Sequence, residues 1–341
     1  MEKIYIYGAG NMGKAAAELL KNKCKILAFL DRNENLDGTF IIDIPVYTPN
    51  HVPDLESVKD SIVLVAMTAC PFLEVKNYLM RLGFNAVISV GDYVSRFYAG
   101  LVNVWKCNDL NRDILDIFSD EESKKEFLVA CDWFEGNVEG ELTLECVDRK
   151  KYFPDFLMQA ISRCQVMLDT ASLEGEYLKN FLNISSDRKA YAYILTPSSI
   201  SLSNLKERLN DKDVVFFEKE AADQNGKVYY QRIGLMNPFT TSEGYIVQVE
   251  KIDQTMHNIK YDYMRCYSMS EVFPILQGGM QTIREYRPMI SVNIGHYESD
   301  FKIVPTYLKS MMEGYLFYFR LHSFQGNDCI LYAVPEERIN L

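Results

Sequence analysis

Three glycines close to the amino terminus have the spacing of a phosphate-binding loop. Gly8, Gly10 and Gly13 directly follow an apolar run at residues 3–7, and helix-forming residues come after them. In such a loop the first glycine permits a tight turn and the second lets a phosphate approach the backbone, while the third allows close packing of helix on sheet. Strand, loop and helix together predict a site for the phosphates of a nucleotide.

Four further residues complete the predicted nucleotide site. Asp31 ends the second apolar run, where a carboxylate can accept hydrogen bonds from ribose hydroxyls. Asn11 and Met12 lie in the first turn of the predicted helix, whose N–H groups lack intrahelical acceptors and bind anions. Thr68 follows a third apolar run, so we expect it beside the same crevice. The alternative, in which the glycines serve packing alone and Asp31 caps a local turn, stays open.

A second strand–loop–helix start lies in the middle of the chain, at residues 165–182. An apolar strand from Val166 leads to Asp169, Glu174 and Gly175, and a helix with apolar residues at helical spacing follows. This geometry offers backbone N–H groups to a ligand at the carboxyl end of a strand. We therefore expect Asp169, Glu174 and Gly175 to form the loop of a cofactor site, if this half of the chain is an enzyme.

Other catalytic patterns are sparse. His296 follows a predicted strand, at a place where a general base can act, although a lone histidine there is more often structural. The sequence has no G-x-S-x-G motif, no P-loop and no Cys/His cluster, so no metal site is predicted. Its 8 cysteines occur singly, which indicates reduced thiols in a cytoplasm.

Composition limits the partners. The formal net charge of −11 argues against a nucleic acid or an anionic membrane surface, because both bind basic proteins. No apolar run is long enough for a membrane span, and the first residues do not resemble a signal peptide. We expect a cytoplasmic protein with a small-molecule or glycan substrate, and an oligomer is compatible with this.

The order of the elements predicts an α/β protein with two Rossmann-like domains, each with its own sheet. We expect a nucleotide-binding domain at residues 1–97, a helical connector at 98–160 and a second domain at 161–341. The connector contains two predicted helices, residues 110–118 and 123–134. The second domain begins with parallel β-α-β turns and ends in strands that look antiparallel, at residues 227–232, 245–251, 289–294, 315–321 and 329–334.

Two parts of the sequence resemble known protein families. Residues 110–335 resemble the FkbM-type methyltransferases, most clearly at YRPMISVNIGHYESDFKIVPTYLKSM, YLFYFRLHSF and DCILYAVP. The resemblance implies a Rossmann-like fold and an S-adenosylmethionine-dependent enzyme that O-methylates sugars or natural products. The segment FLDRNENLDGTFIIDIPVYTP resembles the small amino-terminal domain of bacterial sugar acyltransferases. That resemblance implies a bound nucleotide or nucleotide-sugar.

The sequence departs from the FkbM pattern at the residues that the family uses for its cofactor. Ala171 stands at the glycine of the Asp-x-Gly-Ala-x-x-Gly loop, where a Cβ crowds the backbone. Ile194 stands at the glutamate that accepts from both ribose hydroxyls. Residues 265–270, RCYSMS, lack both acids and the glycine of Lys-x-Asp-x-Glu-Gly. We therefore predict weak binding of S-adenosylmethionine, or none.

Two functions remain open at this point. One is a divergent methyltransferase that acts on a glycan or nucleotide-sugar. The other is a pseudoenzyme that keeps the fold and binds a nucleotide or nucleotide-sugar through its amino-terminal glycine loop. A nicotinamide-dependent dehydrogenase is the weakest candidate, because the first domain is too short and no proton donor lies at a suitable place.

Overall fold

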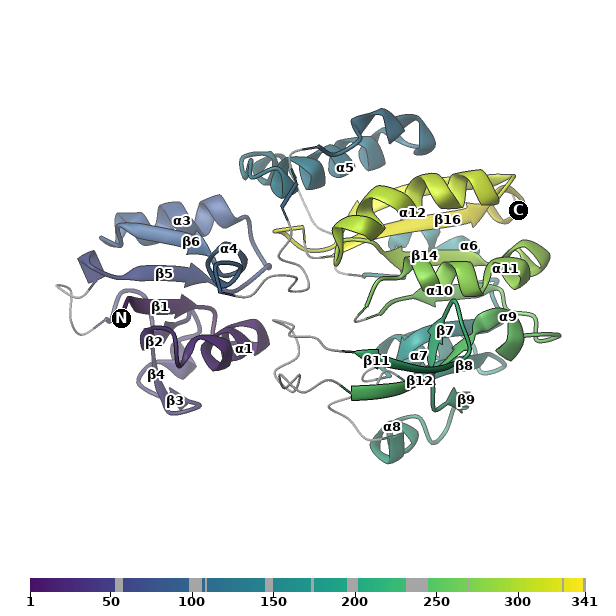
Figure 1. Cartoon of the computed structure of the whole chain (residues 1–341), viewed down its shortest axis with the longest axis horizontal. Helices are drawn as coiled ribbons and strands as arrows, with labels where there is room; N and C mark the ends of the chain where they lie inside the picture. Colours follow the sequence, from purple (N-terminus) through teal and green to yellow (C-terminus); the bar gives the residue numbers. More distant parts are fainter. Residues whose placement is uncertain are drawn as a thin grey trace.

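The computed structural model describes residues 1–52, 58–97, 106–107, 109–144, 150–172, 175–194, 202–230, 245–268, 270–326 and 328–339. These residues form two α/β units that lie side by side along the long axis of the molecule (Figure 1). Each unit has its own mainly parallel sheet, so the predicted α/β fold class is confirmed. The domain limits at residues 97 and 160 stay a prediction.

The first unit is built on a six-stranded sheet. In spatial order its strands are β3 (Phe40–Ile41), β4 (Ile44–Tyr47), β2 (Lys25–Leu30), β1 (Lys3–Tyr7), β5 (Ile62–Val65) and β6 (Ala86–Ser89). Its helices are α1 (Asn11–Leu20), α3 (Phe72–Arg81) and α4 (Val90–Val94). β1 is apolar at every position after Lys3 because both faces of the sheet are covered. Ile4 and Ile6 belong to the same cluster as α1, whereas Tyr5 and Tyr7 share a cluster with α3.

The segment between β2 and β5 is a short excursion, as its Pro, Gly and Asp content predicts. A 3-10 turn at Glu34–Leu36 is followed by the β3–β4 hairpin. The two turn residues, Ile42 and Asp43, have φ of 46° and 62°, values that suit the tight two-residue turn of a hairpin. No α-helix lies among residues 31–52, and helical residues occur at 58–59, shortly before β5.

The second unit contains a seven-stranded sheet. In spatial order its strands are β15 (Tyr315–Leu321), β16 (Cys329–Pro335), β14 (Met289–Asn293), β13 (Tyr263–Cys266), β7 (Val166–Ser172), β8 (Lys189–Ile194) and β9 (Asp213–Phe217). Strands β14, β13, β7, β8 and β9 are parallel, and β16 and β15 are antiparallel. A separate three-stranded sheet contains β10 (Glu220–Ala222), β12 (Tyr245–Lys251) and β11 (Gly226–Tyr230).

Two sequence-based expectations for this sheet are corrected. Strand β13 was not predicted, and it lies in the middle of the sheet between β7 and β14. As a result β14, which the sequence suggested to be antiparallel, pairs in parallel with β13 and is antiparallel only to β16. The other strands expected to be antiparallel do pair in this way, β11 with β12 in the three-stranded sheet and β15 with β16 in the seven-stranded one.

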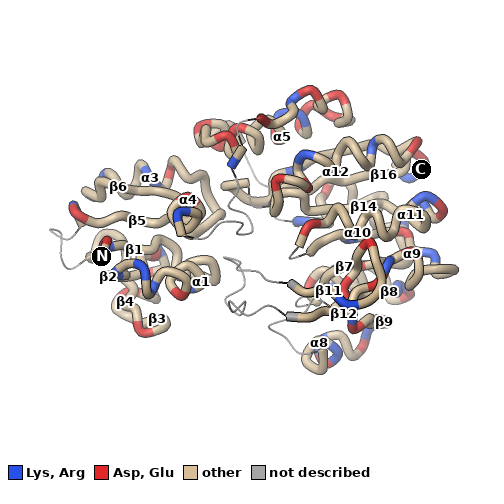
Figure 2. Tube along the Cα trace, viewed as in Figure 1, with Lys and Arg blue, Asp and Glu red and all other residues tan. Residues whose placement is uncertain are grey.

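Short helices cover this second sheet. They are α6 (Met158–Ile161), α7 (Glu176–Leu182), α8 (Leu202–Arg208), α9 (Ile252–Thr255), α10 (Phe273–Gly278), α11 (Met280–Tyr286), α12 (Glu298–Met311) and α13 (Glu336–Ile339). None of the helices in the described part of the chain is long and apolar enough to cross a membrane. Figure 2 shows acidic residues interspersed with basic ones along the elements of both units.

The predicted connector is largely packed on the second unit. Its main helix is α5 (Glu121–Phe134), and 3-10 turns occupy Arg112–Ile117, Gly140–Thr143 and Asp155–Leu157. The helix predicted at residues 110–118 is thus a 3-10 turn. Asp120 caps α5 by accepting the Ser123 N–H at 2.7 Å. Ser123 and Glu126 of α5 accept backbone N–H groups of β15 at 2.9 and 2.5 Å, so the helix covers that edge strand.

Candidate functional site

A cavity of about 270 Å³ lies at the glycine loop of the first unit. It is lined by Tyr7, Gly8, Gly10, Asn11, Met12, Asp31, Arg32, Ala66 and Met67. The cavity lies where the chain order of the sheet reverses, between the carboxyl ends of β1 and β5. Open α/β sheets bind their ligands at this switch point. Of the predicted nucleotide-site residues, Gly13 and Thr68 are the two that do not line it.

Glycine occurs at the three positions of the loop for different physical reasons. Gly8 has φ of +104°, and a Cβ there would lie 2.8 Å from the carbonyl oxygen of Ala66. A Cβ on Gly13 would lie 1.9 Å from the carbonyl oxygen of Gly8. Gly10, by contrast, has φ of −76°, which any residue adopts, and its Cβ would meet no atom within 4 Å. Folding requires glycine at positions 8 and 13 but not at 10.

Asp31 fixes the glycine loop to the end of β2. Its Oδ2 accepts the Ala9 N–H at 2.9 Å, and its Oδ1 accepts the Asn33 N–H at 2.9 Å. The local turn that we considered as an alternative role is therefore present. Each carboxylate oxygen has a second lone pair, so Asp31 can still accept from a ligand hydroxyl.

Arg32 is a pocket residue that the sequence did not single out. Its guanidinium carbon lies 4.6 Å from the ring centre of Tyr78 in α3, so the side chain reaches across the pocket mouth. Burial raises the pKa of Tyr7 to about 12, with Arg32 acting in the opposite direction, which places the cation close to that phenol. In the sequence, Arg32 is indicated only by its position directly after Asp31, where an arginine can contact a ligand phosphate.

The corresponding switch point of the second sheet contains a buried ion pair. Asp169 ends the part of β7 that pairs with β13, and Arg265 lies opposite it on β13. The Arg265 Nη1 donates to Asp169 Oδ1 at 2.6 Å and to the Ala171 carbonyl at 3.1 Å. Only 1% of the Asp169 side chain and 3% of the Arg265 side chain are exposed. Burial lowers the pKa of Arg265, but the Asp169 carboxylate and the Tyr152 and Tyr177 phenols together outweigh it and raise the pKa overall.

Aromatic rings enclose this ion pair. The guanidinium of Arg265 lies over the rings of Tyr152 and Tyr177, 4.5 and 4.4 Å from their centres. The hydroxyl of Tyr152 and the Nε of Arg265 are buried without a hydrogen-bond partner. The side chains of the protein thus occupy the place where an open sheet would receive a ligand.

The described residues of the predicted cofactor loop in the second unit are packed rather than open. Strand β7 continues through Ala171 to Ser172, so Ala171 is a fully buried strand residue. Gly175 caps α7 with φ of +75°, and a Cβ there would lie 2.7 Å from Leu205 Cδ1. Ile194, at the end of β8, belongs to the same apolar cluster as Leu205. Glu174 and Met269 lie outside the described residues.

These residues do not fit S-adenosylmethionine at the usual place. Ile194 offers no acceptor for ribose hydroxyls, and the carboxylate of Asp169 is held by Arg265. A ligand at the end of β7 would have to separate a buried ion pair, which costs about 3–5 kcal/mol when one partner is left alone.

His296 belongs to a second buried polar cluster. Its Nε2 accepts from the Asn293 side-chain amide at 3.2 Å, in the tautomer that this contact requires. Nearby, Lys151 and Asp328 form an ion pair of 2.8 Å. Burial lowers the pKa of His296 to about 4, and Lys151 adds to the shift while Asp328 opposes it. A neutral imidazole whose basic nitrogen is occupied is suited to packing rather than to proton transfer.

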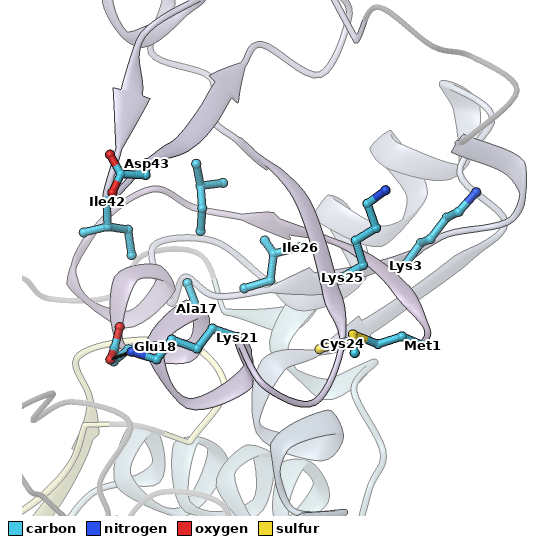
Figure 3. A pocket seen from close by; sticks show the side chains of 11 residues that line it. Met1, Lys3, Ala17, Glu18, Lys21, Cys24, Lys25, Ile26, Ile42 and Asp43 are labelled. Atoms are coloured by element: carbon cyan, nitrogen blue, oxygen red, sulfur yellow. Dashed lines mark hydrogen bonds and ion pairs between the residues drawn. The ribbon is translucent and has the colours of Figure 1, made fainter.

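A larger hollow, of about 560 Å³, lies at the other end of the first sheet (Figure 3). Lys3 and Lys25, the first residues of β1 and β2, extend side by side there, and Lys21 pairs with Glu18. This hollow lies at the amino ends of the parallel strands, whereas open α/β sheets bind ligands at the carboxyl ends. Among the described residues, no group of three or more His, Cys, Asp or Glu side chains could hold a metal ion.

The comparisons with known proteins support the fold. No protein-family model and no curated protein match the sequence. The solved structure of an FkbM methyltransferase from Methylobacillus flagellatus matches with a TM-score of 0.70 and 15% identity, over 97% of this chain and 89% of that chain. The match extends across both units and confirms a methyltransferase-like fold. At this identity it establishes the fold alone.

A second solved structure matches less well. The UDP-D-quinovosamine 4-dehydrogenase from Vibrio fischeri covers 28% of this chain and 84% of its own, at 24% identity and a TM-score of 0.23. A TM-score this low supports no conclusion about the first unit.

Proposed function

We propose that this protein binds a nucleotide or a nucleotide-sugar in the cavity at its glycine loop. The observation that supports this most directly is Gly10. Neither its backbone angles nor its neighbours require glycine, and it lines the cavity. A side chain at this position would project into the space that a ligand phosphate needs.

The remaining residues of the cavity suit the parts of such a ligand. The N–H groups of Asn11 and Met12 at the start of α1 attract phosphate oxygens. Asp31 accepts from ribose hydroxyls with its free lone pairs, and the Arg32 guanidinium neutralises phosphate charge. The cavity of about 270 Å³ is slightly smaller than the roughly 300–1,000 Å³ of complete ligand pockets. It therefore suits the ribose and phosphates of one nucleotide rather than a whole dinucleotide.

In this proposal the second unit keeps a methyltransferase-like fold without S-adenosylmethionine at the end of β7. The Asp169–Arg265 pair and the apolar Ile194 support this part. The competing function is methyl transfer to a glycan or nucleotide-sugar, and it is favoured by the structural likeness to the FkbM methyltransferase. The two functions differ in whether S-adenosylmethionine binds.

Calorimetric titration separates these functions. We expect UDP or a UDP-sugar to bind the wild-type protein and S-adenosylhomocysteine not to bind. Micromolar binding of S-adenosylhomocysteine would favour the methyltransferase.

Two variants then locate the nucleotide. Gly10→Val should abolish binding because its side chain fills the phosphate space, and Asp31→Ala should weaken it by about tenfold or more. Equal binding by wild type and both variants would show that the glycine loop is only a scaffold.

A further inference from the structure

One wall of the glycine-loop cavity is held in place by the second unit. Met67 lines the cavity, and its carbonyl oxygen accepts the side-chain amide of Gln325 at 2.5 Å. The next carbonyl, that of Thr68, accepts the Phe324 N–H at 3.0 Å. Phe324 and Gln325 lie in the turn between β15 and β16, far away in sequence. The loop after β5 therefore lines the cavity on one side and is hydrogen-bonded to the second unit on the other.

The turn that carries Gln325 has an unusual backbone. Gln325 and Gly326 have φ of 62° and 61°, and a left-handed conformation is uncommon for a residue other than glycine. A Cβ at position 326 would lie 2.7 Å from the rings of Trp133 and Phe134, so the turn is pressed against α5. Such conformations persist where the surroundings fix them, and they are frequent at functional sites.

A buried carboxylate fixes the same turn to the first unit. Glu141 accepts the Gln325 N–H with Oε1 and the Phe72 N–H, at the start of α3, with Oε2 at 3.3 Å. The ring of Phe72 packs edge-on against Trp133, with 6.1 Å between centres. The backbone of Gln325 is thus held by Glu141, and its side chain is left to contact Met67.

We propose that Gln325 is a positioning residue for ligand binding in the glycine-loop cavity. Through its hydrogen bond to the Met67 carbonyl it fixes the cavity wall, and occupancy of the cavity is transmitted to the turn between β15 and β16. The same turn leads to Asp328, which pairs with Lys151 in the polar cluster of the second unit. The proposal rests on nucleotide binding at the glycine loop.

Gln325→Glu tests this role with little change of shape. It keeps the size and the backbone preference of the side chain but replaces the amide donor with a carboxylate that repels the Met67 carbonyl. We expect the Kd for UDP or a UDP-sugar to rise about tenfold. Gln277→Glu is the matched control, because Gln277 is an exposed glutamine on α10 of the second unit.

Trp133 provides a direct readout at the joint between the units. The chain has 2 tryptophans, Trp105 and Trp133, so Trp105→Phe leaves Trp133 as the only reporter. In that background we expect added nucleotide to change the Trp133 fluorescence, with the same Kd that calorimetry gives. Adding Gln325→Glu should remove the change or shift its midpoint by the same factor, while Gln277→Glu should leave it intact.

The outcomes distinguish the two proposals. If wild type binds nucleotide and Gln325→Glu binds equally well with the same Trp133 response, Gln325 is only a structural contact and this inference fails alone. A lower melting temperature of Gln325→Glu with unchanged Kd leads to the same conclusion. If wild type binds none of the nucleotides, the proposed function fails and the role of Gln325 falls with it.

Discussion

Asp169 and Arg265 occupy the position in the second sheet that a ligand occupies in related architectures. Both charges are almost completely buried, and the guanidinium donates to Asp169 and to the Ala171 carbonyl. Such a pair is stable only while both partners are present, because the loss of one leaves an uncompensated buried charge. The pair is therefore a packed replacement for a polar ligand.

This interpretation predicts a large non-additive effect. Arg265→Met should lower the free energy of unfolding by about 3–5 kcal/mol, and Asp169→Leu in addition should restore most of it. Urea denaturation of wild type, Arg265→Met and the double variant measures both steps. A loss below about 1 kcal/mol in Arg265→Met would mean that water reaches Asp169 and that the site is open.

The sequence alone predicts only part of the structure around Asp169 and Arg265. The sequence shows that Ala171 and Ile194 replace residues of the FkbM pattern, and it therefore predicts a weakened cofactor site. It cannot show that Arg265 reaches Asp169, since the two are 96 residues apart and meet only because β13 lies beside β7. Arg32 was missed for a similar reason, because its contact with Tyr78 depends on the packing of α3.

At the scale of elements, the glycine loop separates the requirements of folding from those of binding. The close approach between Gly13 and the Gly8 carbonyl brings α1 onto the sheet, whereas Gly10 leaves open space at the helix start. The α1 N-terminus has no side-chain cap, so its N–H groups stay available to an anion.

We therefore expect opposite behaviour from two alanine variants. Gly13→Ala should lower the free energy of unfolding by about 1–3 kcal/mol, because its Cβ overlaps a backbone oxygen. Gly10→Ala should change it by less than about 0.5 kcal/mol and should act on nucleotide binding instead. Thermal unfolding of the free proteins compares them. An equally unstable Gly10→Ala would show that position 10 also serves packing.

The elements differ in how well local sequence defines them. β1, α1 and β2 were predicted closely because the glycine loop and two apolar runs define them without reference to the rest of the chain. β13 was missed because Tyr263–Cys266 is short and carries an arginine, which local preference places outside a buried strand. The partner of that arginine, and so its burial, comes from tertiary structure.

At the scale of the whole molecule, the switch points of the two sheets differ in what fills them. The first has a cavity between β1 and β5, and the second has an ion pair between β7 and β13. The two edges meet where the loop after β5 contacts the turn between β15 and β16. A nucleotide bound as we propose in the first unit would therefore lie beside this joint, from which it could act on the second unit.

We expect Glu141 to make the joint sensitive to pH. Burial raises the pKa of its carboxyl to about 7, although the two backbone N–H groups oppose the shift, and the ordinary value is 4.5. Between these values the folded protein holds a proton that the unfolded chain has released. The contribution of Glu141 to the free energy of unfolding should therefore fall as pH rises from about 4.5 to 7, by up to about 1.4 kcal/mol per pH unit.

Glu141→Gln tests this sign. The variant cannot titrate at position 141, so its free energy of unfolding should fall less steeply between pH 5 and pH 7 than that of wild type. Other groups contribute to the slope of both proteins, namely Glu126, whose pKa burial also raises to about 7, and with the opposite sign His296, whose pKa burial lowers to about 4. Urea denaturation at pH 5, 6 and 7 measures both slopes. Identical slopes would show that Glu141 is ionised in the folded protein throughout this range, with water reaching the joint.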